Sequence, residues 1–232
     1  MSSFTRHADS VQCCDDEWES AYRRFETNGQ EIGKFTRRFL AMGAGGWPRD
    51  SRIACLFCGR GNGMVALERL GFSRLSGFDL SESLLAEYQG PAKCFVADCR
   101  EPLPVEAESY DAAIVQGGLH HLPELPGDLE LVLREVGRIL TPSGRLVLVE
   151  PWMTPFLVLV HAACGLSPAR WASSKLEALA VMIEHERFTY ENWLSRPEEV
   201  RDVLHRHFEP LSERVAWGKL SFVGRPRPGY AT

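Results

Sequence analysis

The sequence predicts an α/β fold with a doubly wound, mostly parallel sheet. Short apolar runs alternate with helical segments along the middle of the chain, which is the order that parallel strands and helical crossovers produce. Glycine, proline or a polar residue lies just beyond each apolar run, so the chain turns where each strand ends. The 232 residues are 44% hydrophobic and 25% charged, which is enough apolar material for one sizeable core. We therefore expect a single domain.

Residues 1–50 are expected to form an N-terminal helical cap. Apolar residues recur at helical spacing from Trp18 to Leu40, and glycines and Pro48 then end the pattern. Lys34, Arg37 and Arg38 lie in this segment, and we interpret them as a solvated basic face.

Residues 51–150 are expected to form the core of the fold. Five apolar runs are predicted to be strands, at 53–57, 75–78, 93–97, 111–116 and 145–150. Helices are predicted near 62–70, over 81–88 with Ser81 as the N-cap, and over 129–140. Ligands of such sheets bind beyond the carboxyl ends of the strands, so we expect the functional residues there.

Residues 151–195 interrupt the alternation and are predicted to be a helical lid insertion. Their aromatic and methionine side chains are either core or the roof of an apolar pocket: Trp152, Phe156, Trp171, Met182, Phe188, Tyr190 and Trp193. Consecutive Glu184, His185 and Glu186 would point about 100° apart on a helix, so we interpret them as a solvated face. Residues 196–232 are expected to complete the core with a helix at 197–207 and a strand within 215–224.

The stretch RIACLFCGRGNG, residues 52–63, combines a buried strand, two cysteines and three glycines. Cys55 lies within the strand and Cys58 at its end. We therefore interpret the two cysteines as small residues that fill space in and beside a buried strand, and a redox pair is the alternative. Gly59 and Gly61 let backbone N–H groups approach a ligand at a helix start. A dinucleotide fingerprint would need glycine at 64, where the chain has Met64.

Two aspartates follow the next two predicted strands. Asp79 lies 18 residues after Gly61, and a carboxylate there can accept both hydroxyls of a ribose. Asp98, one strand further along, is placed to meet an adenine amino group. The three strand ends together predict an adenosine site.

Five motifs in this order resemble those of the class I S-adenosylmethionine-dependent methyltransferases. They are CLFCGRGNG, GFDLSESLL, VADCREPLP, YDAAIVQGGLHHLPE and LREVGRILTPSGRLVLVEP. The resemblance spans residues 50–150 and implies a Rossmann-like, seven-stranded methyltransferase fold. It also implies S-adenosylmethionine as the cofactor, S-adenosylhomocysteine as its product, and methyl transfer as the reaction.

The resemblance assigns cofactor contacts to residues at the strand ends: Phe57, Cys58, Gly59, Gly61, Asp79, Leu80, Asp98, Cys99 and Gln116. The chain departs from the family pattern at two positions. Cys55 stands where an acidic residue usually helps to hold the methionine ammonium group, and Phe57 stands where glycine is usual. Backbone carbonyls of Phe57 and Gln116 would then have to hold the ammonium group.

Two histidines follow the fourth predicted strand, where the family's acceptor pocket begins. A histidine is a suitable base for a hydroxyl or amine near neutral pH, so His121 first and His120 second are candidates for removing the acceptor's proton. The other interpretation is that they only shape the loop. Glu150, at the end of the fifth strand, is a further candidate for the acceptor pocket. Gly117 and His120 replace the metal-binding carboxylates of some family members, so we expect no metal.

Composition narrows the class of partner. The net charge of −5 argues against nucleic acid, and no apolar run reaches the roughly 18 residues of a membrane span. The first 20 residues lack the apolar stretch of a secretory signal, and the seven scattered cysteines indicate reduced thiols, so we expect a cytoplasmic protein without a membrane partner. The sequence gives no signal for oligomeric state.

We therefore expect an enzyme that methylates a small, apolar or aromatic acceptor, on oxygen first and nitrogen second. Two alternatives stay open. Met64 argues against an NAD-dependent oxidoreductase, whereas Cys55 and Phe57 leave room for a catalytically silent relative that binds a cofactor or a partner protein.

Overall fold

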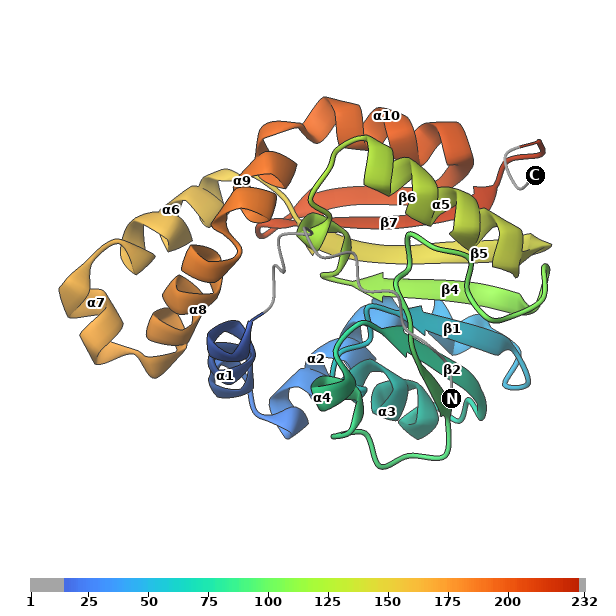
Figure 1. Cartoon of the computed structure of the whole chain (residues 1–232), viewed down its shortest axis with the longest axis horizontal. Helices are drawn as coiled ribbons and strands as arrows, with labels where there is room; N and C mark the ends of the chain where they lie inside the picture. Colours follow the sequence, from blue (N-terminus) through green and yellow to red (C-terminus); the bar gives the residue numbers. More distant parts are fainter. Residues whose placement is uncertain (1–14, 230–232) are drawn as a thin grey trace.

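Seven strands form one sheet in the order β3-β2-β1-β4-β5-β7-β6 (Figure 1). This computed structural model describes residues 15–229. The first five strands are parallel: β1 (Arg52–Leu56), β2 (Arg74–Asp79), β3 (Lys93–Val96), β4 (Tyr110–Gln116) and β5 (Leu140–Pro151). The last two, β6 (Phe208–Ala216) and β7 (Lys219–Pro226), run antiparallel to their neighbours. The predicted doubly wound α/β fold with a mostly parallel seven-stranded sheet is confirmed.

Helices cover both faces of the sheet because side chains along each strand alternate between two apolar faces. Ile53 and Cys55 of β1 pack in the cluster that contains α2 (Asn28–Ala41) and α3 (Asn62–Arg69). Ala54 and Leu56 pack in the opposite cluster, with α5 (Gly127–Ile139) and α10 (Pro197–His207). The core therefore consists of two apolar layers, one on each side of the sheet.

The N-terminal cap contains two helices where the sequence predicted one continuous pattern. Helix α1 (Asp16–Phe25) ends before Thr27, and α2 begins after it, followed by the short 3-10 turn η1 (Ala44–Gly46). The Thr27 hydroxyl accepts the N–H of Gln30, and the Gln30 side chain accepts the N–H of Thr27. This capping box gives the chain a new helix start.

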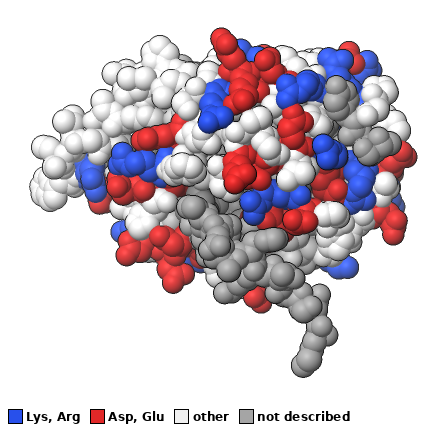
Figure 2. Space-filling view, turned by 45° about the horizontal axis from the view of Figure 1, so that its top comes forward, with Lys and Arg blue, Asp and Glu red and all other residues white. Residues whose placement is uncertain are grey.

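Residues 151–195 form four helices that project from one end of the molecule (Figure 1). They are α6 (Pro155–Cys164), α7 (Ser167–Ala172), α8 (Ser174–His185) and α9 (Arg187–Ser195). Trp152, Tyr190 and Trp193 belong to the core, whereas the side chain of Trp171 is 92% exposed. Figure 2 shows that this projecting lobe carries few charges, in contrast to the mixed charges over the rest of that face.

The C-terminal segment contains two strands, where the sequence predicted one strand within 215–224. Trp217 and Gly218 both have positive φ angles, so the chain turns tightly between β6 and β7. Strand β6 lies at the sheet edge and is mostly exposed, so it lacks the apolar pattern that would have indicated it. Helix α4 (Glu82–Leu85) is also shorter than expected, although Ser81 caps it as predicted. Within residues 15–229, no helix is both long and apolar enough to span a membrane.

Candidate active site

The candidate site lies at the carboxyl ends of β1, β2, β4 and β5. Asp79 ends β2, and its carboxylate accepts the N–H of Gly59 at 2.7 Å and the N–H of Ser81 at 2.9 Å. Burial raises the pKa of Asp79, and these two backbone hydrogen bonds oppose that rise. A carboxylate has about four lone-pair positions, so Asp79 keeps acceptor capacity for further hydroxyl groups. The glycine loop and this aspartate therefore meet, as the sequence predicted.

The glycine loop needs left-handed backbone conformations at three positions. Gly59 and Gly61 have φ angles of 52° and 75°, and Phe57 has a φ angle of 51°. Phe57 thus occupies a conformation that favours glycine, which explains why the family pattern has glycine there. A Cβ atom on Gly118 would lie 2.3 Å from Phe57, so the absence of a side chain at 118 makes room for the ring.

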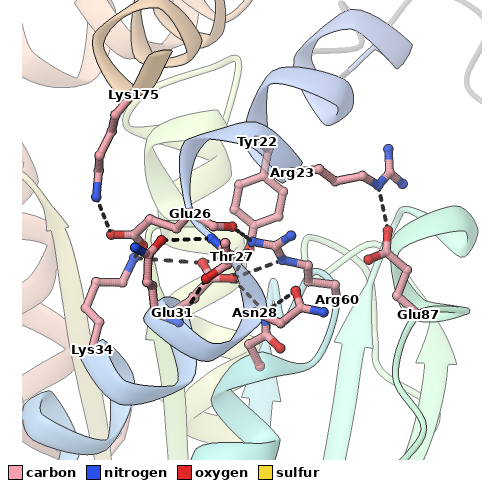
Figure 3. Close-up of polar contacts among 12 residues, drawn as sticks. Tyr22, Arg23, Glu26, Thr27, Asn28, Glu31, Lys34, Arg60, Glu87 and Lys175 are labelled. Carbon is pink, nitrogen blue, oxygen red and sulfur yellow. Dashed lines mark hydrogen bonds and ion pairs between the residues drawn. The ribbon is translucent and has the colours of Figure 1, made fainter. Parts of the chain in front are cut away.

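A buried polar network fixes this loop to the N-terminal cap (Figure 3). The Arg60 guanidinium lies 3.0 Å from Glu31 in α2 and donates to the Glu26 carbonyl at 2.6 Å, while the Tyr22 ring lies 4.6 Å away. Glu31 also accepts from the Tyr22 hydroxyl at 3.0 Å and from the Asn62 amide at 2.8 Å. Glu31 neutralises the charge of Arg60 inside the protein. The glycine loop is therefore fixed to both helices of the N-terminal cap.

Helix α1 lies over the same strand ends. Glu19, which is buried, accepts hydrogen bonds from the hydroxyls of Ser81 and Ser83, two and four residues after Asp79. The Tyr22 hydroxyl lies 3.5 Å from where a Cβ atom of Gly59 would be. The cap therefore roofs the glycine loop and the end of β2.

The adenine side of the candidate site contains Leu80, Asp98 and Cys99. Leu80 is 61% exposed, which leaves an apolar side chain beside Asp79 available to a planar ring. The Asp98 carboxylate forms an ion pair with Arg100 at 2.7 Å, and Arg100 also lies 3.5 Å from Asp128. Cys99 is buried beneath the loop, and burial raises the pKa of its thiol.

The cysteines of the opening motif are free thiols, as are the others in the described part of the chain: Cys55, Cys58, Cys94, Cys99 and Cys164. Burial raises the pKa of Cys55 to about 12 and that of Cys58 well above its usual value. These thiols are therefore uncharged and fill space in and beside β1, and their raised pKa values disfavour the redox alternative.

The histidines after β4 are held by a fully buried carboxylate. Glu150, which is 0% exposed, accepts the N–H groups of Gly118 at 2.8 Å and Leu119 at 2.9 Å, and lies 2.7 Å from Nδ1 of His120. Burial favours the protonated carboxyl, but the His120 ring and the two backbone donors outweigh it and lower the pKa of Glu150. Glu150 thus orients the loop and leaves Nε2 of His120 pointing away from it.

Glu186 corrects an expectation from the sequence, because it is buried and does not belong to a solvated helix face. It follows the last residue of α8, where the chain leaves helical geometry, so its side chain departs from the helix periodicity. Its Oε2 atom accepts the Trp18 indole N–H at 2.8 Å and lies 3.4 Å from Nδ1 of His121 and 3.9 Å from Nε2 of His120. Within residues 15–229, these two histidines and Glu186 form a set whose geometry would allow metal ligation.

Aromatic rings surround the two histidines. The Trp18 ring lies edge-on to His121 at 5.3 Å and stacks on Tyr22 at 5.2 Å. Tyr190 of α9 lies edge-on to His120 at 5.8 Å. The cap and the lid therefore both contribute apolar surface next to these bases.

The basic cluster of α2 is only partly solvated, which also corrects the sequence interpretation. Arg37 is exposed, but Lys34 forms an ion pair with Glu26, and Arg38 is partly buried and donates to Oε1 of Gln116 at 3.3 Å. One side of α2 therefore directs positive charge toward the end of β4.

A hollow of about 420 Å³ lies at the opposite, amino edge of the sheet, lined in part by Trp47, Arg52, Asp111 and Arg145. Arg52 and Asp111 form an ion pair there at 2.9 Å. The functional residues gather at the other edge, and ligands of parallel sheets bind beyond the carboxyl ends, so we do not assign this hollow a role.

Sequence reasoning missed several members of the site, among them Arg60, Glu31 and Glu186. The sequence did contain a signal for Arg60. It lies between two glycines at a strand end, and a charged side chain there needs a partner of opposite charge if other parts of the chain cover the loop. The sequence contained no such signal for Glu31 and Glu186, because their roles depend on how the cap and the lid fold back over the sheet.

Residues 55–148 match the family model described as a methyltransferase domain. A comparison with curated proteins gives no match. The fold is similar to that of a protein from Pyrococcus horikoshii, at 19% identity and a TM-score of 0.68 over 92% of this chain and 100% of that chain. It is also similar to a TehB-like S-adenosylmethionine-dependent methyltransferase from Corynebacterium glutamicum, at 17% identity and a TM-score of 0.57 over 91% and 97% of the two chains.

A third similar structure is the 1,6-didemethyltoxoflavin-N1-methyltransferase of Burkholderia thailandensis, with bound 1,6-didemethyltoxoflavin and S-adenosylhomocysteine. Its identity is 15% and its TM-score 0.58, over 97% of this chain and 92% of that chain. At these identities the likeness to solved structures establishes the fold alone, and the methyltransferase domain match covers residues 55–148 of the chain.

Proposed function

We propose that this chain, whose residues 55–148 match a methyltransferase domain, is a class I S-adenosylmethionine-dependent methyltransferase that methylates a small apolar or aromatic acceptor, on oxygen first and nitrogen second. The observation that carries the proposal is the pairing of His120 with the buried carboxylate of Glu150, next to the rings of Trp18 and Tyr190. Because the matched domain is a methyltransferase domain, we do not pursue the oxidoreductase alternative.

The described residues fit S-adenosylmethionine. Asp79 keeps acceptor capacity for the ribose hydroxyls, and the exposed side chain of Leu80 can lie against the adenine. We assign the adenine amino group to Asp98 and the neighbouring backbone to Cys99. The backbone of Phe57, Cys58, Gly59, Gly61 and Gln116 would line the methionine portion.

The cofactor supplies a methyl group already activated by a positively charged sulfur. Nε2 of His120 would take the acceptor's hydroxyl proton, while Glu150 stabilises the resulting imidazolium at Nδ1. Loss of that proton would make the acceptor oxygen the nucleophile toward the methyl group that the bound cofactor would supply. His121 is the second candidate for the base, since its Nδ1 lies 3.4 Å from Glu186.

A small acceptor suits this site better than a nucleic acid. The net charge is −5, and Figure 2 shows positive and negative side chains interspersed on the face it displays. We also propose that the enzyme works in the cytoplasm, where the five free cysteines of the described chain would stay reduced.

Transfer of labelled methyl groups tests this proposal. The protein is incubated with radiolabelled S-adenosylmethionine and the low-molecular-weight fraction of a cell extract, and label is followed in extracted small molecules. We expect transfer by the unmodified protein and at least a hundredfold slower transfer by His120→Ala, because a positioned base contributes about 10²–10⁴-fold. S-adenosylhomocysteine should bind both proteins equally.

His205→Gln is the matched control, since His205 is partly exposed on α10 and pairs with Glu213. It should transfer label at the unmodified rate. If His120→Ala retains full activity and His121→Ala loses it, the base is His121. Full activity in both variants would contradict a histidine base.

A further inference from the structure

A second group of polar side chains lies beside the histidines, on the α2 side of the sheet. Gln116 is the last residue of β4 and shares the α2-facing side with Ile114, while Lys219 is the first residue of β7 and shares that side with Val223. Arg38 reaches this place from α2, because its Nη1 atom donates to Oε1 of Gln116 at 3.3 Å. Three elements therefore bring an arginine, a lysine and an amide to one edge.

The two cations of this group are partly buried and, in the part of the chain that the structure describes, have no paired carboxylate. Among residues 15–229, neither Arg38 nor Lys219 has a carboxylate within ion-pair distance, whereas neighbouring Lys34 contacts Glu26 and Glu31. The Nε2 atom of Gln116 is buried without a hydrogen-bond partner. A buried amide N–H group without a partner costs stability, and an anionic ligand would satisfy it together with the two cations.

Lys219 also lies close enough to the catalytic groups to feel their charges. Burial first, and the positive charges of Arg38 and Lys34 after it, lower the pKa of Lys219 to about 8. Glu150 and Glu186 act in the opposite direction. Since Glu150 holds His120 and Glu186 lies against His121, this cluster borders the place where the acceptor's reactive atom would sit.

All the free groups in the cluster are hydrogen-bond donors. A guanidinium offers five N–H groups in a planar fork, an ammonium offers three, and the amide nitrogen offers two. Such a set is complementary to an oxyanion, and planar bidentate pairing favours a carboxylate.

We propose that Arg38, Lys219 and the Gln116 amide bind an anionic oxygen group of the methyl acceptor, a carboxylate first and a phosphate second. The acceptor is then an amphiphilic molecule, with its apolar part against Trp18 and Tyr190 and its anion against this cluster. This inference rests on the proposed function, because it assigns the substrate class of the same site.

Fluorine NMR titration of the protein saturated with S-adenosylhomocysteine tests the inference. The probes are 4-fluorobenzoate and its uncharged counterpart 4-fluorobenzamide, with inorganic phosphate as a competitor. We expect the unmodified protein to bind the benzoate at least tenfold more tightly than the benzamide. Arg38→Met and Lys219→Met should each weaken benzoate binding at least tenfold, and Arg37→Met, one position away on the exposed side of α2, should not.

Equal binding of benzoate and benzamide, or equal benzoate binding by all variants, would overturn the inference. If phosphate displaces the benzoate and binds more tightly than it does, the cluster is an anion site as proposed. Phosphate would then rank ahead of carboxylate as its ligand. If Arg38→Met and Lys219→Met instead lose S-adenosylhomocysteine affinity tenfold, the cluster binds the cofactor's own carboxylate and the inference is wrong. Failure of the unmodified protein to bind S-adenosylhomocysteine would contradict the proposed function itself.

Discussion

Phe57 is the residue where this chain departs most clearly from its family's pattern. Its φ angle of 51° costs a non-glycine residue roughly 1–2 kcal/mol. In return its ring packs against the cluster that contains Ala54 and Leu56, over the bare backbone of Gly118. The pair of Phe57 and Gly118 thus forms one unit, in which a strained backbone is retained because a ring fills the space.

Replacing Phe57 should reverse the usual order of glycine and alanine. Phe57→Gly removes both the ring and the strain, whereas Phe57→Ala removes the ring and keeps the strain. We expect the glycine variant to be the more stable by about 1 kcal/mol in urea unfolding. At Arg37, in the exposed middle of α2, the order should be opposite, with Arg37→Ala more stable than Arg37→Gly. If the alanine variant is the more stable one at both positions, Phe57 does not have the left-handed conformation.

Lys219 gives a stability prediction with a definite pH window. Its folded pKa of about 8 lies below the ordinary value of 10.5, so between these pH values the unfolded chain binds more protons and stability rises with pH. The penalty of the buried charge is fully present below pH 8 and is lost by pH 10.5.

Lys219→Met should therefore raise the free energy of unfolding at pH 7, by about 1–3 kcal/mol after allowance for partial exposure. The gain should shrink steadily between pH 8 and 10.5 in urea unfolding series. A destabilised variant at pH 7, or a gain independent of pH, would show that Lys219 is satisfied in the folded protein.

At the scale of elements, the cap and the lid meet over the strand ends through two kinds of contact. Trp18 of α1 donates to buried Glu186, and His185 pairs with Asp15 at 2.7 Å. Lys175 of α8 reaches Glu26 at 2.9 Å, but its side chain is 53% exposed, so solvent screens that pair. The buried indole bond is therefore the stronger connection.

Trp18→Phe should loosen the lid, because Glu186 loses its donor while it stays buried. We expect hydrogen exchange of the backbone N–H groups of α8 and α9 to become at least tenfold faster, which corresponds to about 1.4 kcal/mol. Lys175→Met serves as the comparison and should change exchange less than threefold. Similar acceleration in both variants would mean that the exposed ion pair holds the lid as firmly as the buried bond.

The elements that sequence reasoning placed correctly are those with strong local signals. The apolar runs of β1, β2, β3 and β4 and the periodic helix α5 follow directly from side-chain spacing. The break at Thr27 was missed although its capping signal, threonine followed three residues later by glutamine, is present. Strand β6 could not be found by pattern, because an exposed edge strand has no apolar face to alternate.

The residues of the candidate site also fall into those that local sequence patterns locate and those that depend on tertiary packing. Gly59, Asp79 and the histidines follow from strand ends, which sequence alone can locate. The convergence of Glu186 with His120 and His121 depends on tertiary packing of the lid, which no local pattern encodes. The inward direction of Arg38 also depends on how α2 crosses the sheet.

At the scale of the whole molecule, the parallel half of the sheet brings its carboxyl ends to one edge, and the cap and lid close over that edge (Figure 1). β7 enters antiparallel beside β5, so its first residue, Lys219, lies level with Pro151. The topology therefore places the glycine loop, the histidines and the cation cluster side by side along the order β2-β1-β4-β5-β7.

Calorimetric titration with S-adenosylhomocysteine tests the central claim, that the ends of β1 and β2 jointly hold the nucleoside. We predict that Asp79→Ala weakens binding at least tenfold, or by about 1.4 kcal/mol, while Glu82→Gln on the exposed side of α4 leaves it unchanged. Equal affinity of Asp79→Ala and the unmodified protein would contradict the claim.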